Sequence, residues 1–140
     1  MNRLETTQIE QLALAAREAQ HLAYVPYSHF PVGAAVLGAN GQMYTGANVE
    51  NASYPLTMCA ERIALYRALM DAAGVIRAIS IITPTTSVAS PCGACRQVMY
   101  ELAPEAQVVL LSEDGHYEVT TVKELLPHGF GATQLTTERM

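Results

Sequence analysis

The three cysteines of the chain lie in two short segments, residues 59–61 (CAE) and residues 91–95 (PCGAC). Each segment is followed by a helix-compatible sequence, so each is predicted to begin a helix. Cysteines at a helix start lie beside unpaired backbone N–H groups and the positive end of the helix dipole, which favour the thiolate. The thiolate is the form that binds metal. We therefore predict that two helix N-termini bring three sulfurs to one soft, anionic site.

Three thiolates suit Zn²⁺ and leave one of its four tetrahedral positions open. A catalytic site keeps water there, whereas a structural site closes the position with a fourth protein ligand. The chain has no fourth cysteine, but a histidine could close the site, and the candidates are His21, His29, His116 and His128. Redox use of Cys92 and Cys95 is a weaker alternative, because it leaves Cys59 unexplained and lacks the strand that precedes the motif in thioredoxin-like proteins.

Glu61 lies two residues after Cys59, so on a helix the two side chains do not face each other. Its carboxylate is poorly placed to bind the same ion, but it could reach a metal-bound water from the side and move a proton. The alternative is an ordinary first-turn acid favoured by the helix dipole. Because zinc with three thiolates carries a net negative charge, a donor to sulfur is also expected; Arg62 and then Arg96 are the candidates.

Composition and charge exclude several functional classes. With 140 residues, half of them apolar, residues 1–140 are expected to form one domain that folds without disulfides. The net charge of −5 and the scattered basic residues argue against a nucleic-acid partner. Two charge-poor stretches, residues 19–60 and 78–95, are broken by proline, so no membrane span is predicted. The acidic N-terminus is unlike a signal peptide, and we expect a cytoplasmic protein with reduced cysteines.

Hydrophobic periodicity predicts the elements that must position these residues. A T-x-x-E capping box at Thr7 and Glu10 begins the first predicted helix, and Asn40-Gly41 predicts a hairpin turn. Helices are predicted over residues 8–23, 59–73 and 92–102, with a short one over 121–126. Strands are predicted over residues 32–37, 42–48, 76–82, 107–111 and 116–122. Alternating strands and helices indicate a layered α/β domain with a hairpin in a mixed sheet.

Five segments spread over the chain carry a family resemblance, and they are residues 24–35 (YVPYSHFPVGAA), 45–54 (TGANVENASY), 57–63 (TMCAERI), 90–98 (SPCGACRQV) and 124–130 (ELLPHGF). In order and spacing they resemble the small homotetrameric cytidine deaminases of the three-cysteine zinc type. The resemblance implies a three-layer α/β/α fold with a mixed central sheet of about five strands. It also implies one zinc ion per subunit, held by Cys59, Cys92 and Cys95, with Glu61 as the proton shuttle.

The same resemblance implies the residues that bind substrate. Asn48 and Glu50 correspond to a ribose-binding pair, with Val49 between them. The other implied roles are Phe30 against the base, the Ala60 backbone on the pyrimidine, Arg62 offsetting the thiolate charge, and Tyr54 and Phe130 completing a neighbouring subunit's site. From the residues alone, Asn48 and Glu50 face one way on an extended segment, and an amide with a carboxylate suits sugar hydroxyls. The alternatives are a solvated acid for Glu50, a core aromatic for Phe30 and loop packing for Tyr54 and Phe130.

We therefore expect a homotetrameric enzyme with shared sites that deaminates cytidine and 2′-deoxycytidine hydrolytically to uridine and 2′-deoxyuridine in pyrimidine salvage, releasing ammonia. Three alternatives stay open. A deaminase of a cytosine-bearing antibiotic such as blasticidin S is disfavoured by the N-V-E-N motif at residues 48–51. A structural zinc domain that binds a partner is the non-enzymatic alternative. A polynucleotide deaminase is disfavoured by the acidic charge and the absence of a basic groove.

Overall fold

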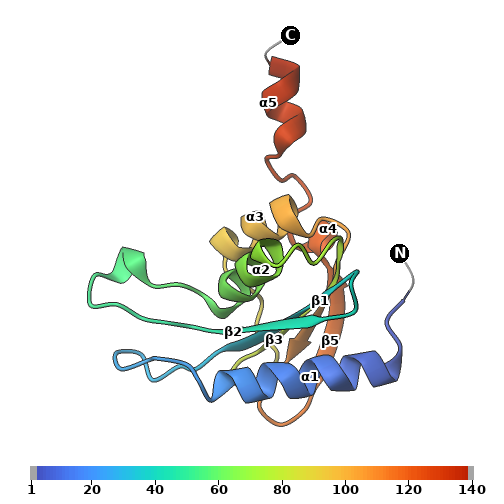
Figure 1. Cartoon of the computed structure of the whole chain (residues 1–140). Coiled ribbons are helices and arrows are strands. Elements are labelled where there is room, and N and C mark those ends of the chain that lie inside the picture. Colours follow the sequence, from blue (N-terminus) through green and yellow to red (C-terminus); the bar gives the residue numbers. More distant parts are fainter. Residues whose placement is uncertain (1–2, 139–140) are drawn as a thin grey trace.

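A five-stranded mixed sheet lies between helices on both faces in the computed structural model, which describes residues 3–138 (Figure 1). The strand order is β2 (Met43–Ala47), β1 (Gly33–Gly38), β3 (Ile76–Ile82), β4 (Gln107–Leu111) and β5 (Tyr117–Thr121). Strands β3 and β4 are parallel, and each other neighbouring pair is antiparallel. Helix α1 (Thr6–Gln20) covers one face, and α2 (Ala60–Met70) and α3 (Gly93–Leu102) cover the other. The predicted three-layer α/β/α fold is confirmed.

Each face of the sheet has its own apolar core, and β3 contributes to both. Ile79 packs among the residues beneath α2 and α3, whereas Ile82 packs among those beneath α1. The alternation follows from the period of two along a strand. Ser80 is fully buried on the α1 side, and its hydroxyl donates to the Leu12 carbonyl at 2.8 Å. A strand buried on both faces explains why residues 76–82 are almost continuously apolar.

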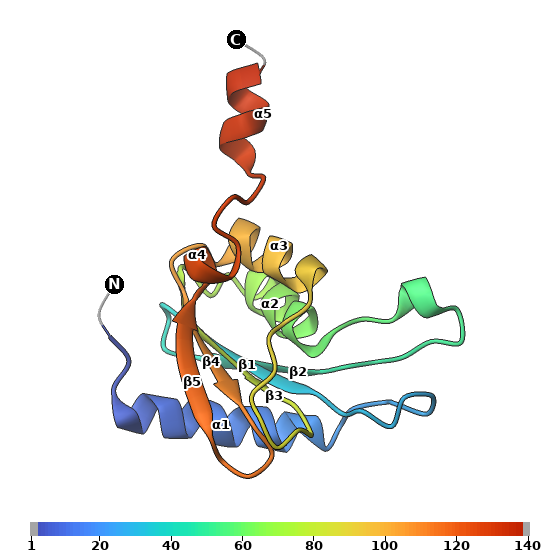
Figure 2. The ribbon, with the colours of Figure 1, turned by 180° about the vertical axis from the view of Figure 1, so that it is seen from behind.

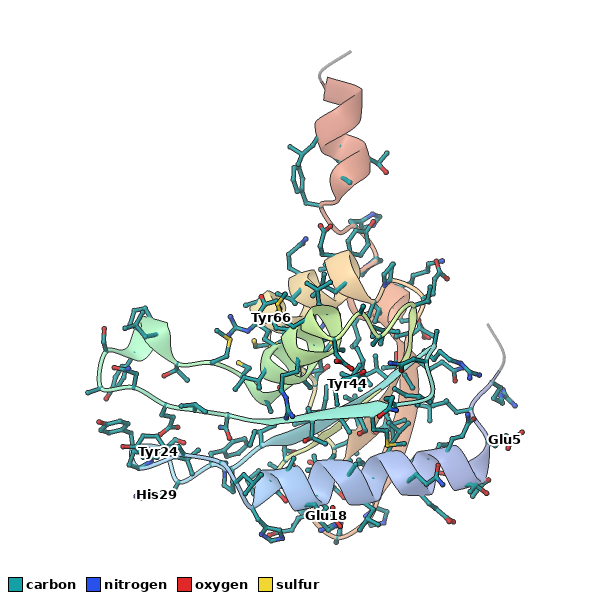
Figure 3. All side chains as sticks on the ribbon, viewed as in Figure 1. Glu5, Glu18, Tyr24, His29, Tyr44 and Tyr66 are labelled. Carbon is teal, nitrogen blue, oxygen red and sulfur yellow. The ribbon has the colours of Figure 1, made fainter. Side chains whose placement is uncertain are left out.

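Small residues let α2 lie unusually close to the hairpin of β1 and β2. A Cβ atom at Gly46 would lie 2.5 Å from the Ala60 carbonyl oxygen and 2.7 Å from the Ala64 amide nitrogen. Figure 3 labels Tyr44 on β2 and Tyr66 on α2, and the Tyr44 hydroxyl donates to Asp71 just after the helix. These contacts fix the height and rotation of α2 over the sheet. They therefore fix the place where α2 begins.

The register of the sheet gathers three chain segments at one end. Gly33 pairs with Ala47 on one side and with Ile82 on the other. The residue before β1 and the residues after β2 and β3 consequently lie at the same end of the sheet, where these strands begin or end. From this end the loop of residues 21–32 and the loop of residues 48–59, which holds the short helix η1 (Tyr54–Leu56), extend side by side (Figures 1 and 2). Backbone bonds join them, from the Tyr24 amide to the Asn48 carbonyl and from the Glu50 amide to the Tyr24 carbonyl, both at 2.9 Å.

Three helix boundaries differ from the prediction by two or three residues, and one of them is the end of α1, which lies at Gln20 in place of residue 23. Helix α1 begins at Thr6, because Glu5 and Gln8 form the capping box in place of Thr7 and Glu10. Helix α2 ends at Met70, because the chain turns through left-handed conformations at Ala72 (φ 52°) and Gly74 (φ 79°). The start of α1 thus follows a local hydrogen bond and the end of α2 follows a left-handed turn, and neither depends on the apolar period.

The C-terminal part of the chain holds one predicted and one unpredicted helix. The short helix α4 (Val122–Leu125) lies where the sequence predicts it. Helix α5 (Ala132–Glu138) was not predicted, since its sequence has no apolar stripe, and it projects away from the sheet layers (Figures 1 and 2). Within residues 3–138, no helix is long and apolar enough to cross a membrane.

Candidate active site

The three cysteines meet at the N-termini of α2 and α3. Cys59 is the N-cap of α2, Cys92 is the N-cap of α3, and Cys95 lies in the first turn of α3. Their Sγ atoms all lie within 4.8 Å of one another, with 3.9 Å from Cys59 to Cys92 and 3.4 Å from Cys92 to Cys95. Tetrahedral zinc with Zn–S bonds of about 2.3 Å requires S···S separations of about 3.8 Å. The sulfur cluster therefore fits one zinc ion.

No histidine belongs to this cluster, although all four histidines lie within the described residues 3–138. The geometry thus gives no support to a site closed by three cysteines and one histidine. A cluster of three ligands leaves one tetrahedral position for a water molecule or a substrate atom. The arrangement is that of a metal site able to act on a ligand.

Hydrogen bonding within the cluster favours the thiolate at Cys59 over the thiolate at Cys95. The Cys95 thiol and the Arg62 guanidinium both donate to Cys59 and lower the pKa of the Cys59 thiol to about 5, against the opposing effect of burial. The same contact with Cys59, together with burial, raises the pKa of Cys95. Of these two thiols, Cys59 is therefore the one disposed to be a thiolate, the form that binds metal.

The two arginines near the cluster have different tasks. Arg62 places Nη2 at 3.2 Å from Cys59 Sγ, and its Nε atom is buried without a hydrogen-bond partner among the described residues. Arg96 donates instead to the Pro91 carbonyl at 2.8 Å, the Leu125 carbonyl at 2.9 Å and Ser90 Oγ at 2.6 Å. Arg62 thus brings positive charge to the sulfurs, whereas Arg96 fastens the loop before Cys92 to α4.

Glu61 is a buried carboxylic acid in the wall of the cavity next to the sulfurs. Only 5% of the residue is exposed, and it lines the same cavity as Cys59 and Cys92. Burial raises the pKa of Glu61, and the nearby Cys59 thiolate raises it further, while its backbone N–H and Arg62 act in the opposite direction. A carboxyl group whose pKa is shifted towards neutrality can both accept and return a proton. The position is that of a general acid–base beside a metal.

The cavity itself measures about 270 Å³. Its wall includes four of the predicted site residues besides the two cysteines: Phe30, Asn48, Ala60 and Glu61. Sequence reasoning missed other wall residues, which are Val32, Thr57, Ile81, Thr83, Ala89, Ser90 and Pro91. Several of these stand next to strand ends, so the pairing register is the signal that would have found them. A separate hollow of about 310 Å³ along α2 has a wholly apolar lining and offers no comparable chemistry.

Asn48 and Glu50 are held firmly by the neighbouring loop. Asn48 Oδ1 accepts from the Val32 amide and Asn48 Nδ2 donates to the Phe30 carbonyl, both at 2.9 Å. Glu50 Oε1 accepts from the Tyr27 and Ser28 amides at 3.0 and 3.1 Å, and Ser28 Oγ donates to Oε2. The bond from the Ser28 hydroxyl, with the two amides, lowers the pKa of Glu50. Sequence reasoning did not identify Ser28.

A second cavity adjoins the first at Thr57, which lines both. Glu50, Tyr54 and Tyr27 line this second cavity. The rings of Tyr27 and Tyr54 pack edge to face, with 6.4 Å between their centroids. Figure 3 shows Tyr24 and His29 on the same projecting loop. The predicted pair Asn48 and Glu50 therefore spans two joined hollows, one beside the sulfurs and one further along the loops.

Two predicted residues lie elsewhere within this one chain. Val49 is exposed and forms isolated β-bridges with Tyr24 and Met58 through its backbone. Phe130 is 56% exposed, and its carbonyl accepts from Gln97 Nε2 at 2.7 Å. Neither is among the described residues that line the two cavities.

Comparison with known proteins agrees with this geometry. Residues 6–111 match the model of the cytidine and deoxycytidylate deaminase zinc-binding region. The chain is 43% identical over 129 residues to a cytidine deaminase of Sporosarcina psychrophila, covering 91% of this chain and 95% of the relative. It is 46% identical over 127 residues to that of Halalkalibacterium halodurans, covering 90% and 96%.

Solved structures give the same result for the fold. The crystal structure of cytidine deaminase from Burkholderia pseudomallei superposes with a TM-score of 0.83 at 46% identity, covering 86% of this chain and 98% of that one. That of Mycobacterium tuberculosis superposes with a TM-score of 0.76 at 38% identity, covering 87% and 96%. With the sulfur cluster and the buried Glu61 in one cavity, these likenesses lead to one conclusion: the chain belongs to the cytidine and deoxycytidylate deaminase family and is a hydrolytic deaminase of the cytidine deaminase type.

Proposed function

We propose that this chain catalyses the zinc-dependent hydrolytic deamination of cytidine and 2′-deoxycytidine to uridine and 2′-deoxyuridine, with release of ammonia, in pyrimidine salvage. The observation that carries the proposal is one cavity that joins Glu61 and the sulfur cluster to Phe30 and Asn48. A proton-transfer group, a metal site, an aromatic ring and an amide around one cavity suit a base linked to a sugar.

Cys59, Cys92 and Cys95 would hold one zinc ion per subunit, which supplies Lewis-acid activation of a water molecule when bound. Three thiolates give the site a net negative charge, which opposes that activation. Arg62 offsets this charge through its bond to Cys59, and the dipoles of α2 and α3 contribute in the same direction. Arg96 keeps the loop before Cys92 in place from outside.

Glu61 is the proposed proton carrier. Its carboxylate takes a proton from the attacking water and passes it to N3 of the pyrimidine while the water oxygen bonds to C4. The carboxyl group then transfers the second proton of that water to the amino group on C4, which leaves as ammonia as the C4–N bond breaks. Water and cytidine are thereby converted to uridine and ammonia with no other reactant. The raised pKa of Glu61 suits both directions of transfer.

The remaining cavity residues are proposed to orient the nucleoside. Phe30 packs against the base, the Ala60 backbone contacts the pyrimidine, and Asn48 and Glu50, which flank Val49, bind the sugar hydroxyls. The amide and carboxylate retain unused hydrogen-bonding capacity for this purpose after their bonds to the loop.

We further propose that residues 1–140 act as one domain within a cytoplasmic homotetramer, with no nucleic-acid or membrane partner. Tyr54 and Phe130 would complete the site of a neighbouring subunit, and their exposure of 73% and 56% in the single chain supports this role. Three free cysteines so close together favour a reducing compartment.

The test is cytidine turnover before and after zinc chelation, followed by the fall in ultraviolet absorbance as cytidine becomes uridine. We expect turnover that is lost on chelation and restored by zinc, with 2′-deoxycytidine accepted and blasticidin S refused. Absence of cytidine turnover by the zinc-loaded protein, or turnover unaffected by complete metal removal, would refute the proposal.

A further inference from the structure

The carboxylate of Glu50 receives its hydrogen bonds from a single turn of the neighbouring loop. The Tyr27 and Ser28 amides donate to Oε1 at 3.0 and 3.1 Å, and the Ser28 hydroxyl donates to Oε2. A carboxylate has about four acceptor positions, so three donors leave about one for anything else. Which position remains, and where it points, is decided by the residues that occupy the other three.

The Ser28 hydroxyl also contacts Phe30, which lines the cavity next to the sulfurs. Its oxygen accepts from the Phe30 amide at 3.1 Å, while its single proton is given to Glu50. The backbone of Phe30 is held on its other side by Asn48 Nδ2, which donates to the Phe30 carbonyl. One hydroxyl group therefore joins Glu50, in the second cavity, to Phe30, in the first.

The turn that carries Ser28 is closed by a backbone hydrogen bond of its own. His29 adopts a left-handed conformation with φ of 56°, and its amide donates to the Val25 carbonyl at 3.0 Å. Ser28 is exposed and belongs to neither apolar core. Its hydroxyl has two partners, both of them groups of the proposed substrate site.

We propose that Ser28 is a positioning residue for recognition of the sugar, acting by fixing the Glu50 carboxylate in one arrangement, while the Phe30 amide holds the Ser28 hydroxyl oxygen. The inference rests on the proposed deamination of cytidine. Two amides alone hold Oε1 but leave Oε2 free to turn towards water. With the Ser28 hydroxyl in place, the sugar hydroxyls meet an acceptor that is already oriented, and binding does not have to order it.

The test compares cytidine with 2′,3′-dideoxycytidine, which keeps the base but lacks the ring hydroxyls that Glu50 would bind. In Ser28→Ala we expect kcat/KM for cytidine to fall about tenfold, mainly through KM, as for loss of one hydrogen bond to a charged group. We expect the value for the dideoxy analogue to change less than about twofold, because that substrate makes no use of the oriented carboxylate. The preference, which is the ratio of kcat/KM for cytidine to kcat/KM for the dideoxy analogue, should therefore fall about five- to tenfold.

Matched variants separate positioning from a general loss of structure. Ser28→Thr keeps the hydroxyl and should retain the preference. Ser53→Ala removes an exposed hydroxyl from the neighbouring loop, where it makes no capping hydrogen bond. It should leave kcat/KM unchanged for both substrates. In the Glu50→Gln background, Ser28→Ala should add little, because the group it positions is already altered.

Three results would overturn the inference. An equal loss for both substrates in Ser28→Ala would show a structural role. An unchanged preference in Ser28→Ala, with the preference lost in Glu50→Gln, would show that Glu50 needs no help from Ser28. An unchanged preference in Glu50→Gln would remove the sugar contact through which Ser28 acts. If the unaltered protein turned over no cytidine at all, the proposed deamination itself would fail, a result distinct from these three.

Discussion

Glu61 illustrates how a single residue takes its function from its surroundings. As a first-turn acid of α2 it is a common helix feature, stabilised by the dipole. In the structure, Glu61 lines the cavity beside the sulfur cluster. Its burial there changes its chemistry, because desolvation raises the pKa of its carboxyl group. Arg62, one residue further, faces the sulfurs instead. Under the proposed mechanism, proton transfer and charge compensation would thus fall to adjacent residues of the first turn.

Replacing Glu61 by glutamine should remove proton transfer and keep the shape of the side chain. We expect kcat to fall by about 10²–10⁴-fold with KM changed far less, because the carboxylate acts in the chemical step. Steady-state kinetics and zinc content by metal analysis check this, with the exposed Glu118→Gln as control. Near-native turnover in zinc-loaded Glu61→Gln would contradict the mechanism.

The hydrogen bonds from the neighbouring loop to the Glu50 carboxylate should be detectable in a pH titration of the protein. Because the pKa of Glu50 in the folded protein lies below its ordinary value of 4.5, the contacts are at full strength above that pH. They weaken as the pH falls through the lowered pKa, when the carboxylate is protonated. The amide proton shifts of Tyr27 and Ser28, followed by nuclear magnetic resonance, should therefore titrate together with a midpoint below 4.5.

Two variants define that titration. Glu50→Gln should abolish it, and His29→Gln, which removes the neighbouring ring charge, should keep it with a small upward displacement. A midpoint at or above 4.5 in the unaltered protein would contradict the hydrogen bonds to Glu50.

At the scale of elements, the site depends on how closely α2 approaches the β1–β2 hairpin. Gly46 leaves no room for a Cβ atom against the Ala60 carbonyl and the Ala64 amide. The backbone that would be displaced belongs to the first turn of α2, which carries Glu61 and follows Cys59. Close packing of a strand glycine against a helix is thereby connected directly to the geometry of the sulfur cluster.

Gly46→Ala should destabilise the fold by about 1–3 kcal/mol, because overpacking forces backbone rather than a flexible side chain to move. Chemical denaturation measures the change in the free energy of unfolding. Gly93→Ala is the matched control, since an added Cβ there meets no atom within 4 Å and the residue begins α3. Equal stability of the two variants would show that α2 can move away from the hairpin without cost.

At the scale of the whole molecule, α2 and the projecting segments leave apolar surface uncovered. Leu69 and Met70 on α2 are exposed, as are Tyr54 in the long loop and Phe130 before α5. Figures 1 and 2 show the long loops and α5 extending from the layered body in different directions. Such surface is expected where copies of a chain pack together.

Light scattering coupled to size exclusion should give a species four times the 15.1 kDa mass of the chain.

Phe130→Ala should raise KM for cytidine while the zinc content stays unchanged, because the ring would act in a neighbouring site and lies apart from the sulfurs of its own chain. A fully active monomer would contradict the shared sites.

Several parts of this molecule were determined by the sequence alone. The positions of the strands and main helices follow from periods of 2 and 3.6, which are local properties of the chain. The two cysteine segments and Glu61 were identifiable for the same reason, since each motif lies within one helix start. Family resemblance then supplied the role proposed for Phe30, and it agreed with the sugar-binding role that the spacing and residue types of Asn48 and Glu50 indicate.

Only the tertiary structure decided which residues, distant in the sequence, line the same cavity. Thr83 and Val32 reach the cavity of Glu61 because Gly33 pairs with Ile82, a register that no local pattern encodes. The bonds of Ser28 to Glu50, and of Arg96 to Leu125, likewise join residues 22 and 29 positions apart. Periodicity fixes what a segment becomes, whereas pairing and side-chain hydrogen bonds between segments depend on the whole chain being packed.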